Sequence, residues 1–448
     1  MKTQDFNNKK VMVFGWARSG KAAAKRLVAL GSKVTVVNGG DFQEDSLYRQ
    51  LLAEGVIFIA HDSPESLDAS FAYLIKNPGI RYDTALVEKA QSLDIPVLSE
   101  VEVALSSFHG RLITVTGSNG KTTTISLIRD MLIADGQSVI TAGNIGTPVS
   151  EVVDDLSAND TLLLELSSFQ LMGLPDIQPD IALITNIFAN HLDYHGTREN
   201  YVAAKFQITK NQSSNQMLVL NADGQDTSSF AAKTRAQVMT FSRKTIGSIS
   251  STDGQDLIID DNHLMALTAI KLVGPHNLEN ILAATTVAKL AGVGDQAIKQ
   301  VLKIFGGVPH RLQYLFTNNG IQFYNDSKAT DIEATQTALN SFEQPTIWLG
   351  GGLDRGDDLM RLLPNLKHVK VVIAFGETQQ KIVALAREAH KPVITVLDAE
   401  HAVPVALQLA ESGDVVLLSP AAASWDQYQS FEERGDKYVA ELKKVLRL

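Results

Sequence analysis

Residues 114–124 read Thr-Val-Thr-Gly-Ser-Asn-Gly-Lys-Thr-Thr-Thr, and the rest of the chain is organised around this stretch. An apolar run at 112–115 predicts a short buried strand before it, and residues 125–134 predict a helix after it. A strand, a glycine turn, a Lys-Thr pair and a helix, in that order, are the parts of a phosphate-binding loop. The stretch therefore predicts an α/β domain with a nucleotide site at the end of one strand.

The residue types in this loop indicate how it would hold a triphosphate. Glycine lets backbone N–H groups converge on phosphate oxygens, and a helix N-terminus adds a partial positive charge aimed at the same anion. Lys121 can reach the β- and γ-phosphates, and the hydroxyl of Thr122 can ligate Mg²⁺. The spacing is shorter than usual, since Val115 stands where the first glycine of the common motif would be. We predict that ATP and magnesium bind here, through Gly117, Ser118, Asn119, Gly120, Lys121, Thr122 and Thr123.

Length and composition restrict the class of protein. At 448 residues the chain exceeds one hydrophobic core, so about three domains are expected. Cysteine is absent, which excludes disulfides and thiolate chemistry, and the net charge of −10 argues against nucleic acid as the main partner. The polar start has no signal-peptide pattern, and no apolar run approaches the ~20 residues that span a membrane. We expect a cytoplasmic monomer that acts on small molecules, with no nucleic-acid or membrane partner.

A second glycine turn lies in the first segment, residues 1–99. Residues 11–37 predict a strand, a glycine turn at 15–20, a helix and another strand, which is a unit where diphosphates dock. The G-x-G-x-x-G spacing is missing, and Asn38 stands where an NAD site needs a carboxylate for the ribose. A hydride-transfer domain is therefore disfavoured, while a site for another nucleotide diphosphate stays open. Residues 77–79, Asn-Pro-Gly, end a later strand either as a plain turn or as part of such a site.

Polar side chains follow two predicted strands of the middle segment, residues 100–307. Glu165 ends an apolar strand, at the place where an acid on a neighbouring strand meets magnesium beside a phosphate loop. His191 and Asp193 follow the next strand and fall at the same predicted edge. A solvated acid and a structural histidine are the alternatives for these positions.

Other residues of the middle segment give weaker signals. Glycines on both sides of Asn144 permit a ligand to approach closely, but an ordinary loop fits equally well. Lys205 reads, from its surroundings alone, as a solvated residue of a helix. Residues 238–272 alternate β-like runs with turns and predict a small β excursion. Asn277 and Asn280 share one helix face, where they either contact a base or cap the helix.

The last segment, residues 308–448, predicts a new series of strands and helices. It begins with a linker that ends in Arg311, and most of its strands precede a polar turn, which indicates a mostly parallel sheet. Lys328, Arg355 and Ser424 fall in such turns and offer two cations and a hydroxyl to a small dicarboxylate. Arginine is the better fork for a carboxylate.

Taken in order, these segments predict an α/β protein with three domains. Residues 1–99 would form a Rossmann-like domain in which a site for a nucleotide diphosphate stays open. Residues 100–307 would form a central P-loop ATPase-type domain with a parallel sheet. Residues 308–448 would form a C-terminal Rossmann-like α/β domain.

Short motifs in all three segments carry a resemblance to a known family. They are T-G-S-N-G-K-T-T, L-E-L-S-S-F-Q, N-H-L-D-Y-H-G with A-A-K, G-P-H-N-L-E-N, P-H-R, N-D-S-K-A-T, and L-S-P-A-A-A-S-W-D-Q with F-E-E-R-G. In this respect the chain resembles the Mur ligases of bacterial cell-wall synthesis. The last two motifs favour the member that adds D-glutamate, and the D-N-P-R signature of the member that adds a diamino acid does not occur.

The resemblance implies a ligation that consumes ATP. The terminal carboxylate of UDP-N-acetylmuramoyl-L-alanine would be phosphorylated, and the amine of D-glutamate would attack the acyl phosphate. Lys121 would then stabilise the transferring γ-phosphate, Thr122 and Glu165 would hold one Mg²⁺, and His191 would lie at a second. Lys205 matches the lysine that this family carbamylates, which would turn its ammonium into a carboxylate-like metal ligand.

The resemblance also implies binding residues outside the loop. The remaining nucleotide contacts would be Asn277, Asn280, Arg311 and Asp326; the UDP substrate would meet Ala17, Arg18, Asn38, Asn77, Pro78, Gly79 and Asn144; and D-glutamate would meet Lys328, Thr330, Arg355, Ser424 and Phe431. The family has lysine at the position of Arg355 in some members, and its first-domain loop varies. The assignments there depend less on matched motifs than those at the phosphate loop.

Three other functions fit parts of the sequence. Folylpolyglutamate synthetase shares the loop and the ligation chemistry, but the strand–helix–strand unit before the loop speaks against it. A regulatory or scaffold protein with an inactive nucleotide site is disfavoured by the intact Lys121, Glu165, His191 and Lys205. A dehydrogenase is disfavoured by Asn38.

Overall fold

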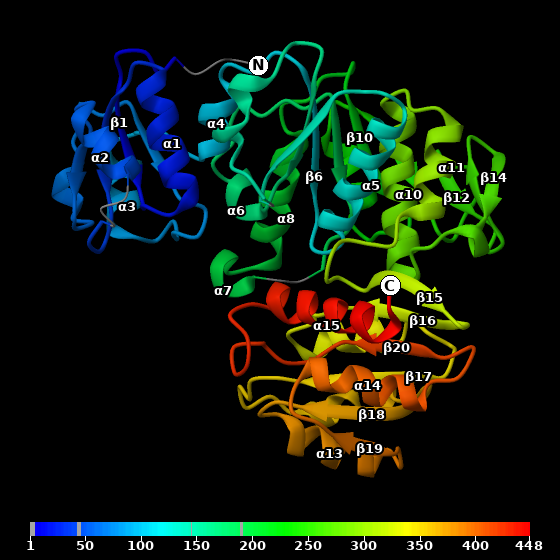
Figure 1. Cartoon of the computed structure of the whole chain (residues 1–448). Coiled ribbons are helices and arrows are strands. Elements are labelled where there is room, and N and C mark those ends of the chain that lie inside the picture. Colours follow the sequence, from blue (N-terminus) through cyan, green and yellow to red (C-terminus); the bar gives the residue numbers. More distant parts are fainter. Residues whose placement is uncertain (1–4, 43–45, 145, 189–190) are drawn as a thin grey trace. The chain divides into compact units, whose positions relative to one another are not determined.

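The computed structural model describes residues 5–42, 46–144, 146–188 and 191–448, apart from the side chains of Asp193 and Ser228. These residues form a mixed α/β protein with three sheets, in which parallel strand pairs dominate (Figure 1). The chain divides into two compact units. The first contains the residues up to Leu267 together with Glu279–Val301, and the second contains Thr268–Leu278 and Leu302–Leu448. None of the helices within the described ranges has the length and apolar character needed to cross a membrane.

The first unit begins with a parallel five-stranded sheet in the order β3-β2-β1-β4-β5. Its elements are β1 (Lys10–Phe14), α1 (Arg18–Ala29), β2 (Lys33–Val37), α2 (Ser46–Ala53), β3 (Ile57–Ile59), β4 (Tyr73–Lys76), α3 (Ala85–Ser92) and β5 (Val97–Leu98). The strand–helix–strand unit predicted from the sequence is present, although its helix begins at Arg18. A Cβ on Gly20 would lie 2.0 Å from the carbonyl oxygen of Gly15, so the predicted turn requires glycine there.

The first unit also contains a nine-stranded sheet in the order β14-β13-β12-β11-β10-β9-β6-β8-β7. Its elements, with the helices around them, are α4 (Glu100–Leu105), β6 (Arg111–Thr116), α5 (Lys121–Ala134), β7 (Val139–Gly143), β8 (Thr161–Glu165), α6 (Ser168–Leu171), β9 (Ile181–Ile184), α7 (Leu192–His195), α8 (Arg198–Phe206), β10 (Met217–Asn221), α9 (Thr227–Lys233), β11 (Gln237–Phe241), β12 (Ser250–Thr252), β13 (Asp256–Ile259), β14 (Asn262–Ala266), α10 (Pro275–Leu290) and α11 (Asp295–Ile304). The strands from β7 to β12 pair in parallel, and the last three strands extend this sheet instead of forming a separate excursion.

The position of β6 in this sheet determines where the phosphate loop lies. β6 pairs with β9 on one side and β8 on the other, and its apolar residues are fully buried, as expected for a central parallel strand. The residues after β6, β8 and β9 therefore meet at one edge of the sheet. Glu165 and the loop thus come together as the sequence predicted.

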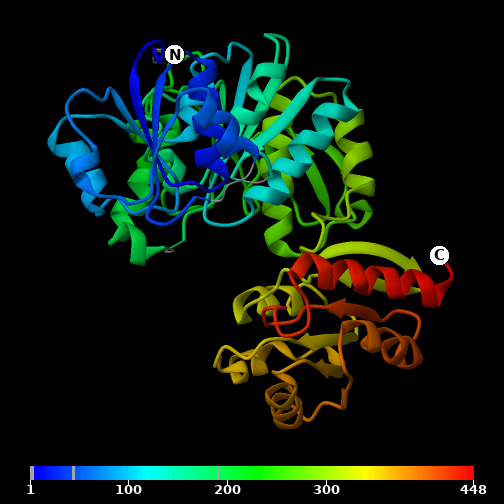
Figure 2. The same cartoon turned by 60° about the vertical axis from the view of Figure 1, so that its left-hand side comes forward.

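The second unit contains a six-stranded sheet in the order β15-β16-β20-β17-β18-β19. Its elements are β15 (Gln313–Asn318), β16 (Ile321–Asn325), α12 (Ile332–Leu339), β17 (Thr346–Gly351), β18 (Val369–Phe375), α13 (Gln379–Glu388), β19 (Val393–Thr395), α14 (Ala399–Leu409), β20 (Val415–Leu418) and α15 (Phe431–Leu446). Figure 1 and Figure 2 both show α15, in red, lying along this sheet, and it buries Tyr438 and Leu442 in the core on that face.

β15 is an antiparallel strand that the sequence interpretation missed. It pairs with β16 through a two-residue turn, Asn319-Gly320, in which both residues have positive φ, 50° and 78°. Asn-Gly between two strand-like runs is the strongest short-range signal for a hairpin. The signal was therefore present in the sequence, and the strand was overlooked because the first strand of the segment was placed at 322–324 and residues 312–321 were given no structure.

Candidate active site

The two glycines of the phosphate loop are enforced by close backbone contacts. Gly117 and Gly120 have φ values of 149° and 81°, in a region that side chains disfavour. A Cβ on Gly117 would lie 1.9 Å from Oγ1 of Thr185, and one on Gly120 would lie 2.0 Å from Oδ1 of Asn280. The loop is therefore packed against the end of β9 and against α10, and no side chain fits at either position.

Hydrogen bonds from β9 hold the loop between these glycines. The backbone N–H of Asn119 donates to Oδ1 of Asn186 at 2.9 Å, and Oγ1 of Thr185 donates to the carbonyl of Asn119 at 2.7 Å. Ser118 is bonded to the hydroxyl of Tyr201 at 2.8 Å. Thr185, Asn186 and Tyr201 were not singled out from the sequence, because nothing in their spacing marks them as partners of the loop.

Lys121 begins α5 and turns back over the loop. Its Nζ donates to the carbonyl oxygens of Gly117 and Ser118, at 2.9 and 3.0 Å. Thr122 and Thr123 follow in the first turn of the helix. The predicted lysine, hydroxyl and helix N-terminus therefore lie together at the loop, in an arrangement that suits an anion.

Glu165 ends β8 and joins the loop to the segment after β7. Only 2 % of Glu165 is exposed, and its carboxylate accepts hydrogen bonds from Oγ1 of Thr122 at 3.1 Å and from Nδ2 of Asn144 at 2.9 Å. The alternative of a solvated strand-end acid is therefore wrong. A buried carboxylate beside a hydroxyl offers oxygen ligands of the kind that Mg²⁺ prefers.

Lys205 is not the solvated helix residue that its surroundings in the sequence suggest. It lies on α8 with 2 % of its area exposed, and its Nζ donates to the carbonyl of Gly117 at 2.8 Å and approaches Oγ1 of Thr116 at 3.4 Å. Burial, helped by the positive charge of Lys121 and opposed by Glu165, lowers the pKa of Lys205 to about 6. Its amine is therefore largely neutral at pH 7 and directly behind the phosphate loop.

His191 lies at the start of the short helix α7. It is exposed, has a left-handed backbone with φ of 53°, and its ring is 5.2 Å from the ring of Phe169, which follows β8. His191 thus comes near the segment that follows β8, four residues after Glu165. The side chain of Asp193, also singled out from the sequence, lies outside what the structure describes, as do residues 189 and 190.

The residues predicted to meet the UDP substrate surround the turns after β1, β2 and β4. Ala17 precedes α1, and the side chain of Asn38 accepts a hydrogen bond from the N–H of Trp16 at 3.3 Å. Asn77 lies against Gly15, and Pro78 and Gly79 complete its turn. The carboxyl ends of β1, β2 and β4 thus place these residues at one edge of the sheet.

Arg18 was predicted to meet the same substrate, but its side chain contacts a different segment of the chain. Its guanidinium donates to the carbonyl of Gly146 and pairs with Glu151 at 3.4 Å, on the segment that follows Asn144. With 61 % of its side chain exposed, this arginine nevertheless connects the five-stranded sheet's first helix to the region of the phosphate loop.

The second unit gathers the residues predicted for D-glutamate. Nζ of Lys328 lies 4.1 Å above the ring of Phe431, and the guanidinium of Arg355 lies 4.7 Å above the ring of Trp425. Ser424 is buried beside Trp425, and the N–H of Thr330 donates to the carbonyl of Lys328 at 2.8 Å. Trp425, 65 % exposed, was missed by the sequence reasoning, although the quoted motif contains it.

One buried arginine organises these loops. Arg434 has no exposed area, and its guanidinium donates to Oγ and the carbonyl of Ser327 and to the carbonyls of Gly351, Ala422 and Ala423, at 2.8–3.4 Å. Burial lowers its pKa to about 10, so it stays charged. The sequence interpretation did not assign it a role.

The other residues predicted to contact the nucleotide lie in separate parts of the structure. Asn280 is buried in the first unit, against Gly120. In the second unit, Asn277 donates to the carbonyl of Val273 at 2.7 Å, and Arg311 is exposed. Asp326 accepts from the N–H of Leu312 and from Oγ of Ser419, at 2.8 and 2.9 Å, and burial raises its pKa to about 7.

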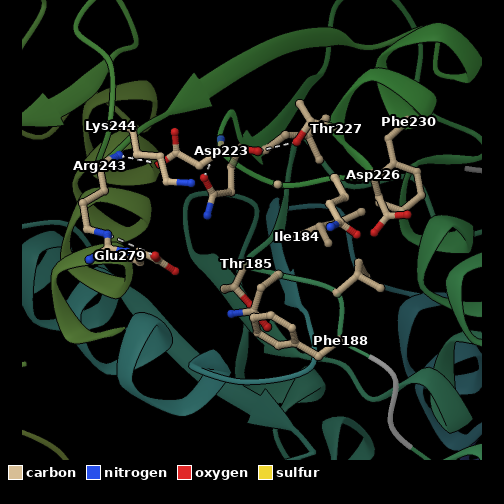
Figure 3. A pocket seen from close by; sticks show the side chains of 16 residues that line it. Ile184, Thr185, Phe188, Asp223, Asp226, Thr227, Phe230, Arg243, Lys244 and Glu279 are labelled. Atoms are coloured by element: carbon tan, nitrogen blue, oxygen red, sulfur yellow. Dashed lines mark hydrogen bonds and ion pairs between the residues drawn. The ribbon is translucent and has the colours of Figure 1, made fainter. Parts of the chain in front are cut away.

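A cavity of about 310 Å³ lies beside the loop, at the carboxyl ends of β9 and β10 (Figure 3). Thr185 and Phe188 line one side of it, and Arg243 points toward Glu279 on another, 3.3 Å away. Nothing in the sequence analysis predicted this cavity. It shares Thr185 and Asn186 with the set of side chains that hold the loop.

A strand-end phosphate loop, a buried acid and a buried amine define the class: a nucleotide-binding enzyme of the P-loop type. Comparison with known proteins narrows this class. The Mur ligase middle domain matches residues 115–288, and the Mur ligase glutamate ligase domain matches residues 310–422. The chain belongs to the Mur ligase family.

Individual relatives resemble the chain over its whole length. It is 73 % identical over 447 residues to a UDP-N-acetylmuramoylalanine–D-glutamate ligase of Leuconostoc citreum, covering 100 % of both chains. It is 70 % identical over 448 residues to the ligase of the same name from Leuconostoc mesenteroides, again over 100 % of both. Among solved structures, the UDP-N-acetylmuramate–alanine ligase of Thermotoga maritima matches with a TM-score of 0.58, over 98 % of this chain and 100 % of that one. At 19 % identity this last likeness concerns the fold alone.

Proposed function

We propose that the chain joins D-glutamate to UDP-N-acetylmuramoyl-L-alanine, with ATP converted to ADP and phosphate. The observation that carries this proposal is the buried amine of Lys205, 2.8 Å from the carbonyl of Gly117 in the phosphate loop. The second support for the proposal is the similarity of the chain, over its whole length, to relatives that are named for this ligation. Burying the amine of a lysine is costly, and the nearby carboxylate of Glu165 offsets that cost only in part, which favours a functional use of this amine.

The side chains present at the loop fit magnesium. Mg²⁺ prefers oxygen ligands, and the hydroxyl of Thr122 and the carboxylate of Glu165 lie 3.1 Å apart at the helix N-terminus. These two residues would hold one ion, while His191 and a carbamate on Lys205 would hold a second. Magnesium would neutralise charge on the phosphates and so make the γ-phosphorus easier to attack.

The residues of the chain have separate tasks in the reaction. The backbone N–H groups of residues 117–121 and the ammonium of Lys121 orient the γ-phosphate. An oxygen of the alanyl carboxylate attacks phosphorus, the bond to the bridging oxygen breaks, and ADP leaves. The amine of D-glutamate then attacks the acyl carbon, the bond to the phosphate oxygen breaks, and the amide forms as a proton leaves nitrogen.

Two further groups would bind the other substrates. Ala17, Asn38, Asn144 and residues 77–79 would hold the UDP-linked substrate, and Arg18 would act through its contact with Gly146. Lys328, Thr330, Arg355, Ser424 and Phe431 would receive D-glutamate, since two cations suit its two carboxylates. Asn277, Asn280, Arg311 and Asp326 would complete the nucleotide site.

The proposal also covers organisation and location. Residues 1–99, 100–307 and 308–448 would form the UDP-substrate, ATP and D-glutamate domains, which agrees with one sheet in each range. The absence of cysteine fits a reducing compartment, so we place the reaction in the cytoplasm and expect a monomer.

A substrate panel tests the proposal. Phosphate release is measured with ATP and magnesium while UDP-N-acetylmuramate or its L-alanyl form is combined with each candidate amino acid. Release should require the L-alanyl form and D-glutamate together. Equal turnover with L-glutamate would contradict the substrate assignment, and the absence of ATP consumption with every combination would refute the ligase.

The carbamate on Lys205 has its own test. Its neutral nitrogen would attack CO₂, forming an N–C bond and releasing a proton. Protein equilibrated with ¹³C-labelled bicarbonate should give one additional carbonyl resonance in its ¹³C spectrum, and Lys205→Met should lack it. A spectrum of the wild-type chain without that resonance would refute the carbamate.

A further inference from the structure

Lys76 is a buried cation that the proposed reaction does not use. It ends β4 with 3 % of its area exposed, and its Nζ donates to the carbonyls of Asn77 at 3.1 Å and Ile80 at 2.6 Å. The ring of Tyr82 lies 4.6 Å from the same nitrogen. Burial lowers the pKa of Lys76 to about 8, so its charged form still predominates at pH 7. Lys76 therefore stabilises the turn 77–80 by donating hydrogen bonds to its first and last residues.

The same turn is bonded to α7. Oη of Tyr194 donates to the carbonyl of Ile80 at 2.9 Å and lies 3.5 Å from Nζ of Lys76. The carbonyl of Ile80 thus accepts hydrogen bonds from Lys76, at the end of β4, and from Tyr194, which lies 114 positions after Ile80 in the sequence. This is a specific connection between the turn and the helix.

Helix α7 carries His191 and is fixed on its other side to the segment after Glu165. The backbone N–H groups of Tyr194 and His195 donate to the carbonyl of His191, at 3.1 and 3.0 Å. Nε2 of His195 lies 2.9 Å from Oγ of Ser168. The ring of Phe169 packs against the rings of Tyr194 and His195 in α7 and of His191 at its N-cap, with centroid distances of 4.4–5.4 Å.

We propose that Lys76 and Tyr194 are positioning residues, which hold turn 77–80 on α7 and thereby place His191 for the metal site. This inference rests on the proposed function, which puts the UDP-linked substrate at residues 77–79 and a metal ion at His191. Lys76 and Tyr194 act through the carbonyl of Ile80 and through α7. Occupation of the turn by substrate and occupation of His191 by metal would then depend on the same hydrogen bonds.

The chain provides a matched control for the key hydroxyl. Tyr194→Phe removes the donor to Ile80 and keeps the ring that packs on Phe169. Tyr82 also has a buried hydroxyl, and within the described part of the chain that hydroxyl has no hydrogen-bond partner. Tyr82→Phe therefore removes the same atom from a neighbouring tyrosine without breaking a bond to the turn.

The experiment compares steady-state constants of the wild-type chain, Tyr194→Phe and Tyr82→Phe. We expect Tyr194→Phe to raise about 10-fold both the KM for UDP-N-acetylmuramoyl-L-alanine and the Mg²⁺ concentration at half-maximal rate, as expected when support for a metal ligand is lost. The KM for ATP should stay within twofold, because the loop is held by β9 and α10. Tyr82→Phe should match the wild-type chain.

Several outcomes would overturn the inference. A loss of kcat alone would indicate destabilisation, a parallel rise in the KM for ATP would indicate a general disturbance, and constants equal to those of Tyr82→Phe would leave Tyr194 without a role. If Tyr194→Phe does not fold, Lys76→Met takes its place with the same expected constants. A wild-type chain that releases no phosphate would refute the proposed function itself, whereas an active wild-type chain with an unaffected Tyr194→Phe would refute only the positioning role.

Discussion

Lys205 and Arg434 are both cations that the fold removes from water, yet their surroundings differ. The guanidinium of Arg434 donates five hydrogen bonds, to Ser327, Gly351, Ala422 and Ala423. The ammonium of Lys205 donates two, to Gly117 and Thr116, with the cation of Lys121 and the carboxylate of Glu165 near it. Burial lowers the pKa of Arg434 to about 10 but that of Lys205 to about 6.

The difference separates a structural cation from a reactive one. A guanidinium with its donors used stays charged and joins the loops that it contacts. An amine with few acceptors beside a like charge gives up its proton and becomes a nucleophile. Burial lowers the pKa of both groups most, and the number of acceptors and the sign of the neighbouring charges then distinguish the cation that keeps its proton from the one that loses it.

The largest effect should come from removing the amine of Lys205. We expect Lys205→Ala to lower the ligation rate by more than about 100-fold, beyond the loss usual for a residue that only supports a metal ligand. A short carboxylic acid such as acetate should restore part of the rate, since it can replace the carbamate. Phosphate release measures both. Unchanged turnover in Lys205→Ala would remove the basis for calling this cation reactive.

Replacing Arg434 should lower the free energy of unfolding, whereas replacing Lys205 should not. Arg434→Met leaves several buried carbonyl oxygens without donors and should lower the free energy of unfolding by about 3 kcal/mol or more. Lys205→Met should leave it equal or higher, because the variant no longer buries a poorly paired amine. Urea unfolding of the two variants, followed by circular dichroism, measures the contrast. Equal losses of unfolding free energy in the two variants would contradict the distinction between a structural and a reactive cation.

The pH dependence of unfolding sharpens the same contrast. Between pH 6 and 10.5 the unfolded chain binds a proton at Lys205 that the folded chain does not, so the stability of the folded chain rises with pH. This group contributes up to about 1.4 kcal/mol per pH unit in that window. In CO₂-free buffer at pH 7–9, Lys205→Met should therefore show a smaller slope than the wild-type chain. An identical slope would mean that the pKa of Lys205 is ordinary.

The smallest effect concerns a third cation, which is exposed. Arg355 lies over the ring of Trp425, and such a contact at the surface contributes little. Trp425→Ala should raise the KM for D-glutamate about threefold and leave the KM for ATP unchanged. Trp425→Phe, which keeps an aromatic face, is the control. A rise of more than tenfold would place Trp425 itself in the glutamate site.

The sequence predicted those features that depend on local order along the chain. The phosphate loop follows a buried strand, Glu165 ends another, and both facts are readable from apolar runs and their last residues. The positions of Lys205, Tyr194 and Arg434 are not, because each depends on which segments pack together. Lys205 looked solvated on its helix, and only the likeness to a family corrected that view. The hairpin at Asn319-Gly320 was readable and was overlooked.

The tight contacts of Gly117 and Gly120 have a consequence for inhibitor design. A methyl group at either position would overlap Thr185 or Asn280, so neither residue can be substituted without damaging the loop. A compound whose contacts are confined to their backbone N–H groups would meet a target with little freedom to mutate.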